Sequence, residues 1–375
     1  MTAIVMTSGV RSGLDKLDHP VTPSREVDQI DGSLVCTAVR HVTHDVMDFV
    51  LEAEQPSRFA FEPGQHLTIT VTVDGERLSR CYSVSSPASQ PDSLTITVKR
   101  TPGGLVSHWL HDQVRPGDLL EVAGPFGAFT SSQPRSAPQL YLSAGSGITP
   151  LMSMARTIVD EGASTDVVLV HHARTPDDIV FRHELAGMGD QHPGVRVVVV
   201  CEGDCPTEAW TGHRGRIDAA FLAAEVPDVR EREVFLCGPS AYLVAAQAAL
   251  ATCGVDASRV HVESYDLRTD SPAAAVDADL TADVATVVAT YAVDFRASGR
   301  VVDCPAGTTI LEAASQAGLS LASSCREGVC GTCKTSMLTG SVDMRHGGGI
   351  RQREIDRNQI LLCCSTPTTD LVLDA

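Results

Sequence analysis

The 375-residue sequence lacks any long run of lysine and arginine, and its basic side chains are outnumbered. It has 29 Lys and Arg against 47 Asp and Glu, which gives a formal net charge of −18 at pH 7. Proteins that bind nucleic acids depend on basic side chains to neutralise phosphates. The charge balance therefore excludes nucleic acid from the partners that we expect.

Long apolar segments are also missing. No stretch approaches the ~20 apolar residues that a helix needs to span a bilayer, and residues 1–18 have no continuous apolar core of a secretory signal. These absences predict a cytoplasmic protein that has no membrane partner.

Short stretches of the first third of the chain alternate between apolar and polar residues. After a polar segment at 1–33, which we predict to be a tail, this pattern runs from 34 to 132 and includes 67–73 and 94–98. Period-two alternation between Gly- and Pro-rich turns is typical of half-buried strands. We therefore predict that 34–132 forms an antiparallel β-barrel.

The pattern changes near residue 133. Apolar runs and helical stretches alternate from there, at 140–142, 149–160, 167–170, 197–200, 234–236 and 241–252. Buried strands that alternate with helices predict an α/β nucleotide-binding domain with a parallel sheet, which we place at 133–266. An Ala- and Asp-rich linker is expected at 267–288, and a third, small domain at 289–375.

Twelve cysteines are present, and four of them have a specific spacing. Cys325, Cys330 and Cys333 follow the pattern C-x4-C-x2-C, and Cys363 comes after 29 further residues. In a chain of this size without a secretory signal, clustered cysteines are more often metal ligands or redox groups than disulfides. Thiolates at this spacing are typical of a plant-type 2Fe–2S cluster. A four-cysteine zinc site is the alternative, although such sites usually contain two C-x2-C pairs.

The whole segment 291–375 resembles plant-type ferredoxin domains, which implies an α+β β-grasp fold. Residues 308–314, with the sequence TTILEAA, match the helix that precedes the cluster loop in that family. Residues 361–367 match the ferredoxin ending in which the last ligand comes four residues before a proline. The resemblance thus implies that Cys363, and not its neighbour Cys364, is the fourth ligand.

A second motif is the run Arg80-Cys-Tyr-Ser83. An arginine can hold a flavin phosphate with two hydrogen bonds, Tyr82 can pack against the isoalloxazine, and Ser83 can bond its N5–C4=O edge. An edge-strand surface pair is the alternative for Arg80 and Tyr82. The run Gly103–Ser107 then opens a predicted helix at 107–113, and the amides at a helix N-terminus suit a phosphate.

Together these motifs resemble the ferredoxin–NADP reductase superfamily, which 61–65 (FEPGQ) and 124–127 (GPFG) also match. The resemblance implies FAD as the flavin, with FMN as the alternative. It also implies the flavin contacts Arg80, Cys81, Tyr82, Ser83, Val98, Lys99, Gly104, Leu105, Val106 and Ser107.

A third motif joins the strand at 140–142 to the helix at 149–160. Glycines at such a turn let the backbone approach a pyrophosphate, and the start of the helix favours its charge. The form G-S-G-I-T-P also resembles the superfamily. The expected dinucleotide contacts are Gly145, Ser146, Gly147, Ile148 and Thr149.

Two further turns are assigned by this resemblance. In the superfamily, the turn matched by Cys237, Gly238 and Pro239 lies beside the nicotinamide ring, although Cys237 could equally be a buried core residue. The segment that ends at Tyr265 resembles the element that closes over the flavin. Tyr82, Ser83, Cys237 and Tyr265 are therefore expected at the hydride-transfer site.

Acidic residues surround the expected position of the adenosine. Glu202 and Asp204 follow one buried strand, while Asp177 and Asp178 follow another. Arg174 is the one candidate clamp for the 2′-phosphate of NADPH. The acidic loops therefore predict NADH rather than NADPH.

The order of flavin, nicotinamide and ferredoxin domains resembles the reductase components of multicomponent oxygenases. That resemblance implies electron flow from NADH through FAD and a 2Fe–2S cluster to a terminal oxygenase, with a Rieske-type oxygenase as the expected partner. The order also resembles the NADH reductases of hybrid-cluster proteins, and a non-enzymatic redox carrier or sensor is a third possibility.

Overall fold

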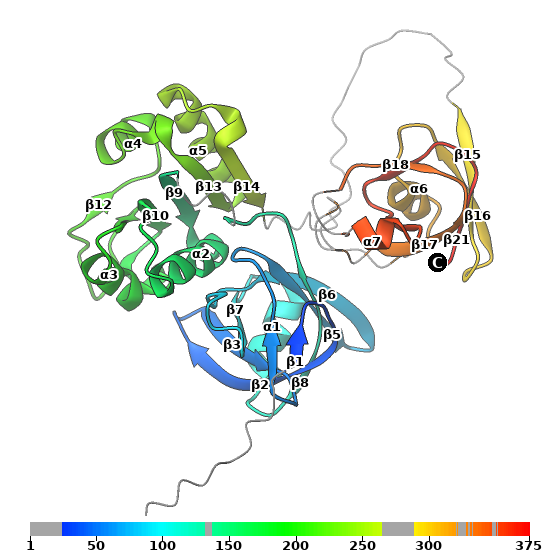
Figure 1. The fold of residues 1–375 in the computed structure, drawn as a ribbon, viewed down its shortest axis with the longest axis horizontal. Coiled ribbons are helices and arrows are strands. Elements are labelled where there is room, and N and C mark those ends of the chain that lie inside the picture. Colours follow the sequence, from blue (N-terminus) through cyan, green and yellow to red (C-terminus); the bar gives the residue numbers. More distant parts are fainter. Residues whose placement is uncertain are drawn as a thin grey trace, which may run out of the picture.

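The computed structural model describes residues 25–131, 137–264, 289–319, 321, 328, 331, 333–346, 350 and 352–375. They form three domains, which follow one another along the chain (Figure 1). None of the described helices is long and apolar enough to cross a membrane.

The first domain is a curled antiparallel sheet. Its strands are hydrogen-bonded in the order β6-β5-β8-β2-β3-β7, and a bridge between Val84 and Ile96 brings the two edges together as a barrel. Helix α1 packs Val106 and Leu110 into the barrel core. The elements are β1 (Arg25–Val27), β2 (Ile30–His41), β3 (Val46–Glu52), β4 (Ser57–Phe59), β5 (His66–Val73), β6 (Glu76–Ser83), β7 (Leu94–Lys99), α1 (Leu105–Gln113) and β8 (Leu119–Phe126).

Residues 25–33 differ from the tail that the sequence predicted. Strand β1 pairs with β4, and β2 already begins at Ile30 and pairs with β8. Ile30 and Leu34 are buried, but residues 31–33 between them are exposed. The start of β2 therefore lacks the alternation that reveals a half-buried strand.

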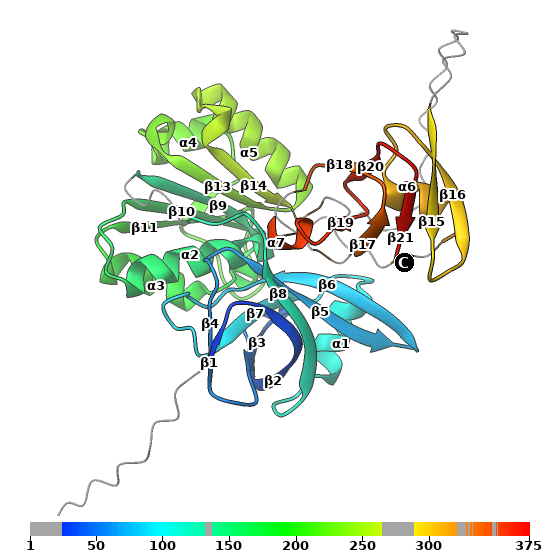
Figure 2. The ribbon, with the colours of Figure 1, turned by 45° about the vertical axis from the view of Figure 1, so that its right-hand side comes forward.

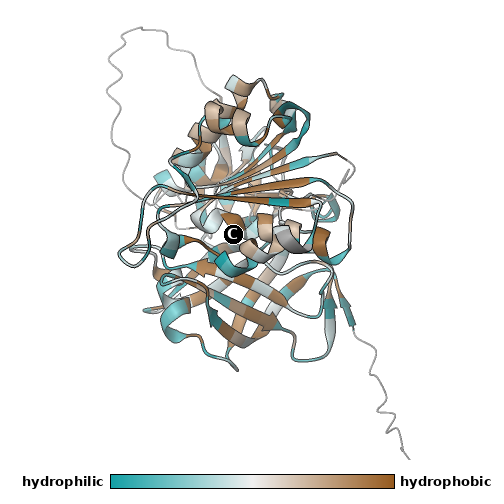
Figure 3. Cartoon of the chain, turned by 90° about the vertical axis from the view of Figure 1, so that its left-hand side faces the viewer, coloured by the Kyte–Doolittle hydropathy of each residue, from teal (hydrophilic) through white to brown (hydrophobic). Residues whose placement is uncertain are grey.

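The second domain is a parallel sheet covered on both faces (Figure 3). Its strand order is β12-β11-β10-β9-β13-β14, and Tyr141 of β9 packs towards α2 and α3 while Leu140 and Leu142 pack towards α4 and α5. The elements are β9 (Gln139–Ala144), η1 (Gly145–Gly147), α2 (Ile148–Asp160), β10 (Val167–Ala173), η2 (Pro176–Asp178), α3 (Arg182–Gln191), β11 (Val195–Cys201), β12 (His213–Arg214), α4 (Ala219–Glu225), η3 (Val229–Glu231), β13 (Glu233–Gly238), α5 (Ser240–Cys253), η4 (Ala257–Arg259) and β14 (Val260–Ser264).

Strand order reverses at β9, because β10 lies on one side of it and β13 on the other. Open parallel sheets bind ligands outside the carboxyl ends of their strands at such a switch point. The turn after β9 therefore lies where a dinucleotide binds in this class of fold.

The third domain is a mixed sheet with one helix in its core. The strand order is β16-β15-β21-β17-β19, with β15 and β21 parallel, and α6 buries Ile310 and Ala314 against the sheet. This is the predicted β-grasp architecture. The elements are β15 (Thr290–Phe295), β16 (Arg300–Pro305), α6 (Ile310–Gln316), β17 (Lys334–Thr339), β18 (Val342–Met344), α7 (Gln352–Ile355), β19 (Gln359–Leu361), β20 (Ser365–Pro367) and β21 (Leu371–Leu373).

Helix α2 holds the first two domains together. Ser153 Oγ donates to the carbonyl of Ser86 at 2.7 Å, and Arg156 Nη1 donates to the carbonyl of Ser85 at 2.5 Å. The same guanidinium donates twice to Glu184 of α3. These bonds fix the segment that follows the arginine–tyrosine–serine motif against the nucleotide-binding domain.

Candidate functional site

The arginine–tyrosine–serine motif forms the end of β6. Arg80 and Tyr82 lie two residues apart, so they share one side of the strand. Tyr82 is half-buried against the barrel core, and burial raises the pKa of its phenol well above the usual value. The phenol is therefore neutral at any physiological pH, which suits a ring that packs against a flavin.

Ser83 connects this motif to the second domain. Its buried hydroxyl donates to Glu263 Oε2 across 3.4 Å, which joins the end of β6 to the end of β14. Glu263 belongs to the segment ending at Tyr265 that the sequence assigned to the flavin site, but its bond to Ser83 was not predicted, because the two residues are 180 positions apart. Tyr265, which was expected to close over the flavin, lies outside the described residues.

The predicted phosphate seat is the start of α1. The helix begins at Leu105, two residues before the predicted start, and no side chain caps its N-terminus at Gly104. A Cβ on Gly104 would come within 2.8 Å of Ser107 Oγ, so the turn is closed tightly. An open pocket of about 320 Å³ lies here, bordered by Gly104, Leu105, His108 and Trp109 among others. Uncapped amides and a helix dipole beside a pocket fit a flavin phosphate.

Three other expected flavin contacts lie in the first turn of α1 and at the end of β7. Ser107 Oγ accepts the Thr101 amide at 3.2 Å and donates to the Gly104 carbonyl at 3.0 Å, so it shapes the loop. Val98 is buried in the barrel core, while Lys99 pairs with Asp45 at 2.8 Å.

The structure brings two distant turns together at the switch point. A Cβ on Gly147 would lie only 2.4 Å from the carbonyl oxygen of Cys237, so glycine is required for this approach. Gly145 has a φ of 53°, a left-handed value that favours glycine. The buried Cys237 and the start of α2 thereby lie against each other, although the sequence showed them only as separate motifs.

The start of α2 fits a pyrophosphate. It has no capping side chain and no acidic residue in its first turn, and Thr149 Oγ1 donates to the Ser146 carbonyl at 3.1 Å. The first-turn amides of the helix are thus directed at the switch point with the positive end of the helix dipole.

Histidines behind this turn add no positive charge to it. His171 Nδ1 lies 2.9 Å from Ser143 Oγ, and His172 Nδ1 lies 3.2 Å from the Tyr242 hydroxyl. Burial lowers the pKa of His171 to about 3 and that of His172 to about 4. Both imidazoles are therefore neutral at physiological pH.

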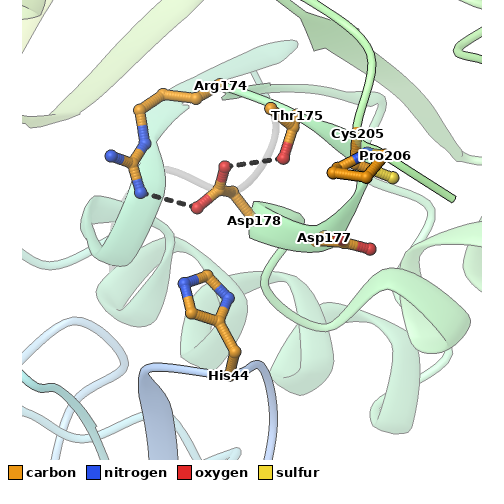
Figure 4. Close-up of a pocket in the computed structure, with 7 residues that line it drawn as sticks. All are labelled: His44, Arg174, Thr175, Asp177, Asp178, Cys205 and Pro206. Atoms are coloured by element: carbon orange, nitrogen blue, oxygen red, sulfur yellow. Dashed lines mark hydrogen bonds and ion pairs between the residues drawn. The ribbon is translucent and has the colours of Figure 1, made fainter. Parts of the chain in front are cut away.

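Figure 4 shows a pocket at the carboxyl ends of β10 and β11. It has a volume of about 530 Å³ and is bordered by His44, Arg174, Thr175, Asp177, Asp178, Cys205 and Pro206. Arg174 Nη2 donates to Asp178 Oδ1 at 2.7 Å, and Thr175 donates to the other oxygen at 2.8 Å. Arg174, which borders this pocket, is thus already paired with a carboxylate.

Two of the four predicted cluster ligands lie in described parts of the chain, and they are adjacent. Cys333 and Cys363 are both buried, and the Cys363 amide donates to Cys333 Sγ at 3.5 Å. The Gly328 amide donates to Cys363 Sγ at 3.2 Å. Amides directed at sulfurs favour thiolates that carry a cluster. Cys325 and Cys330 lie outside the described residues.

Cys364 is oriented differently from Cys363. Its thiol donates to the carbonyl of Leu361 at 3.7 Å. A Cβ on Gly328, which has a φ of 72°, would lie 2.7 Å from Cys364 Sγ. The thiol of Cys364 therefore fills the space under the glycine turn, while Cys363 receives the amide hydrogen bond.

A nicotinamide turn, a flavin motif and a cysteine cluster in one chain define an oxidoreductase that transfers electrons between three redox groups. Comparison with protein families agrees with this class. Residues 33–131 match the oxidoreductase FAD-binding domain, 141–248 the oxidoreductase NAD-binding domain and 293–368 the 2Fe-2S iron-sulfur cluster binding domain.

The chain belongs to the family of reductase components of oxygenase systems. It is 40% identical to the glycine betaine monooxygenase reductase subunit of Pseudomonas aeruginosa, over 90% of this chain and 94% of the relative. It is 36% identical to the stachydrine N-demethylase reductase subunit of Rhizobium meliloti, over 91% and 96%. A solved structure of phthalate dioxygenase reductase superposes with a TM-score of 0.55 at 27% identity, over 92% of this chain and 97% of that one.

These findings confirm the fold class, the enzyme class and the cofactors that the sequence predicted. The chain uses NADH, FAD and a 2Fe–2S cluster.

Proposed function

We propose that the terminal partner is a Rieske-type oxygenase that removes a methyl group from a betaine. The observation that supports this substrate class is the pair of relatives named for glycine betaine and stachydrine, at 40% and 36% identity over nearly their whole length. Both compounds are small quaternary amines that carry a carboxylate. A reductase for ketosteroid monooxygenase, from Rhodococcus rhodochrous, is less similar at 32% identity. We place the reaction in the cytoplasm, where NADH is regenerated.

The bound cofactors supply the electron chemistry, since a hydride from NADH carries two electrons, a flavin accepts both, and a 2Fe–2S cluster carries one at a time. We propose that the main role of the protein is to hold the cofactors in position relative to one another. Tyr82 provides a neutral ring and Arg80 a cation for the flavin. The hydrogen bond from Ser83 to Glu263 sets the distance between the flavin domain and the nucleotide domain.

For the nicotinamide, we propose that Cys237 and Gly238 form the floor on which the ring lies. The close packing of Gly147 against Cys237 leaves no room for a side chain between the two turns, and Cys237 is fully buried. Tyr265 is proposed to close over the flavin. At the third centre, Cys325, Cys330, Cys333 and Cys363 are the proposed ligands.

The test of the partner is a reconstituted reaction. Purified reductase, NADH and a Rieske-type oxygenase encoded beside this gene should release one formaldehyde for each NADH and O₂ consumed with a betaine substrate. A ketosteroid should give no product with the same pair. NADH oxidation that never couples to betaine demethylation with the neighbouring oxygenase would contradict the proposed substrate class.

The pocket bordered by Arg174 and Asp178, where we expect the adenosine of the dinucleotide, predicts which nicotinamide cofactor is preferred. Wild-type protein should have a higher kcat/KM with NADH than with NADPH. Arg174 already pairs with Asp178, so its guanidinium is not available to the 2′-phosphate of NADPH. Replacement of Asp178 by Asn should raise kcat/KM for NADPH about tenfold, since a hydrogen bond to a charged group contributes roughly 1.5–3 kcal/mol. Steady-state kinetics with ferricyanide as acceptor measures both values.

Two variants control this experiment. Asp177→Asn removes a neighbouring carboxylate that makes no bond to Arg174 in Figure 4, and it should leave the preference nearly unchanged. Arg174→Ala in the Asp178→Asn background should abolish the gain, and on its own it should affect NADPH more than NADH. A wild-type preference for NADPH would refute the argument.

A further inference from the structure

The cluster-binding domain contacts the flavin-binding barrel through β17 and α7. The Lys334 ammonium, at the start of β17, lies 5.3 Å from the centre of the Phe126 ring at the end of β8. In α7, Arg353 Nη1 is 3.6 Å from Asp28 Oδ2, and Arg353 Nη2 donates to Gln29 Oε1 at 3.4 Å. Figure 2 shows α7 on the side of its domain that faces the barrel.

These contacts lie between the cluster ligands and the flavin motif. On one side, Lys334 directly follows the predicted ligand Cys333. On the other side, the Phe126 ring is 6.2 Å from the ring of His66, and His66 is the strand partner of Ser83. Association through this face therefore brings a cluster ligand close to the hydroxyl that is expected at the flavin edge.

The contacts have the character of a reversible association. The side chains of Arg353 and Asp28 are 52% and 73% exposed, and exposed ion pairs are weak and screened by salt. Lys334 is fixed within its own domain, because it pairs with Glu354 at 2.6 Å and both side chains are only 18% exposed. Its ammonium thus reaches Phe126 from a prearranged position.

We propose that β17 and α7 form a docking face that holds the cluster-binding domain on the flavin-binding barrel, with Arg353 on Asp28 and Lys334 on Phe126. In this arrangement the face would hold the predicted cluster ligand Cys333 close to the flavin motif, where one electron would pass from a reduced flavin to an oxidised cluster without exchange of atoms. The weak, charged contacts then release the domain to its external acceptor. The inference rests on the assigned electron flow from flavin to cluster.

Charge reversal tests the face in the full-length holoenzyme. Arg353→Glu and Asp28→Arg should each slow cluster reduction several-fold in stopped-flow experiments, while flavin reduction by NADH is unchanged. The double variant restores opposite charges and should recover most of the rate. Arg345→Glu is the matched control, because Arg345 is 86% exposed and pairs with Asp343 within its own domain.

A second measurement does not depend on activity. In the variant Asp28→Cys/Arg353→Cys, a bifunctional thiol-specific cross-linker as long as the replaced ion pair should join residues 28 and 353, as detected by mass spectrometry of the linked peptides. The pair Asp28→Cys/Arg345→Cys should not link. If NADH failed to reduce the flavin, the assigned function would be wrong. The cross-link would still test whether the two domains associate through this face.

Three results would overturn the docking face. One is wild-type cluster reduction in both single variants, and another is slowing that the double variant does not rescue. The third is slowing only of electron transfer to an added oxygenase, which would assign the face to the external acceptor.

Discussion

Replacement of Cys363 by Ser should remove the visible absorption and the reduced-state EPR signal of the 2Fe–2S cluster. Cys363 Sγ receives the Gly328 amide at 3.2 Å, and the Cys363 amide bonds Cys333 Sγ, so the two predicted ligands lie side by side in one buried site. A serine hydroxyl is a poor substitute for a soft thiolate ligand of iron. Flavin content and NADH–ferricyanide activity should remain, because the cluster-binding domain has a hydrophobic core of its own, which shares no residue with the cores of the other two domains.

The neighbouring cysteine provides the matched control. Cys364→Ser should retain the absorption spectrum, since the thiol of Cys364 donates to the Leu361 carbonyl and the smaller hydroxyl fits the same space. The opposite pattern, with bleaching in Cys364→Ser and an intact cluster in Cys363→Ser, would exchange the two assignments.

Truncation in the linker near Asp279 should separate two activities of the chain. The remaining protein keeps the barrel, the nucleotide domain and the bonds of Arg156 and Ser153 that join them. It should therefore fold, bind FAD and reduce ferricyanide with NADH at nearly the wild-type rate. It should lose most cytochrome c reduction and all support of an oxygenase, because these acceptors take electrons from the cluster.

Both activities should be measured on one truncated preparation, together with its flavin content. If the third domain were only a structural cap, flavin loss and aggregation would lower both activities in parallel. Retained cytochrome c reduction and oxygenase support would show that the cluster is not on the electron path. Asp28 and Phe126, the barrel residues that contact Arg353 and Lys334, are not members of the barrel's hydrophobic core, so removal of the domain should be tolerated.

Regular elements with a clear hydrophobic period could be predicted from the sequence. The strand expected at 67–73 is β5 (His66–Val73), and the helix expected at 149–160 is α2 (Ile148–Asp160). A period of two in a strand and a period of 3.6 in a helix both indicate that one face of the element is buried. Each period can be recognised within a short stretch of sequence. The start of β2 was not predicted, because its exposed polar residues follow neither period.

The sequence by itself determined the chemistry of each centre. Three cysteines spaced on one loop, a glycine turn after a strand, and an arginine near a tyrosine and a serine are short-range patterns, and their resemblance to known families, together with the motifs beside them, indicated their functions. These patterns specified the cofactor classes and the order of the domains before any contact was known.

Only the tertiary structure decided how the centres are placed relative to one another. The bond of Ser83 to Glu263 and the fit of Gly147 under Cys237 each join residues that are far apart in the chain. The neutralisation of Arg174 by Asp178 depends on side-chain orientation, which spacing alone left open. Register and side-chain direction result from packing of the whole domain, so no local pattern encodes them. The contact of Arg353 with Asp28 spans almost the entire chain and follows only from the association of two folded domains.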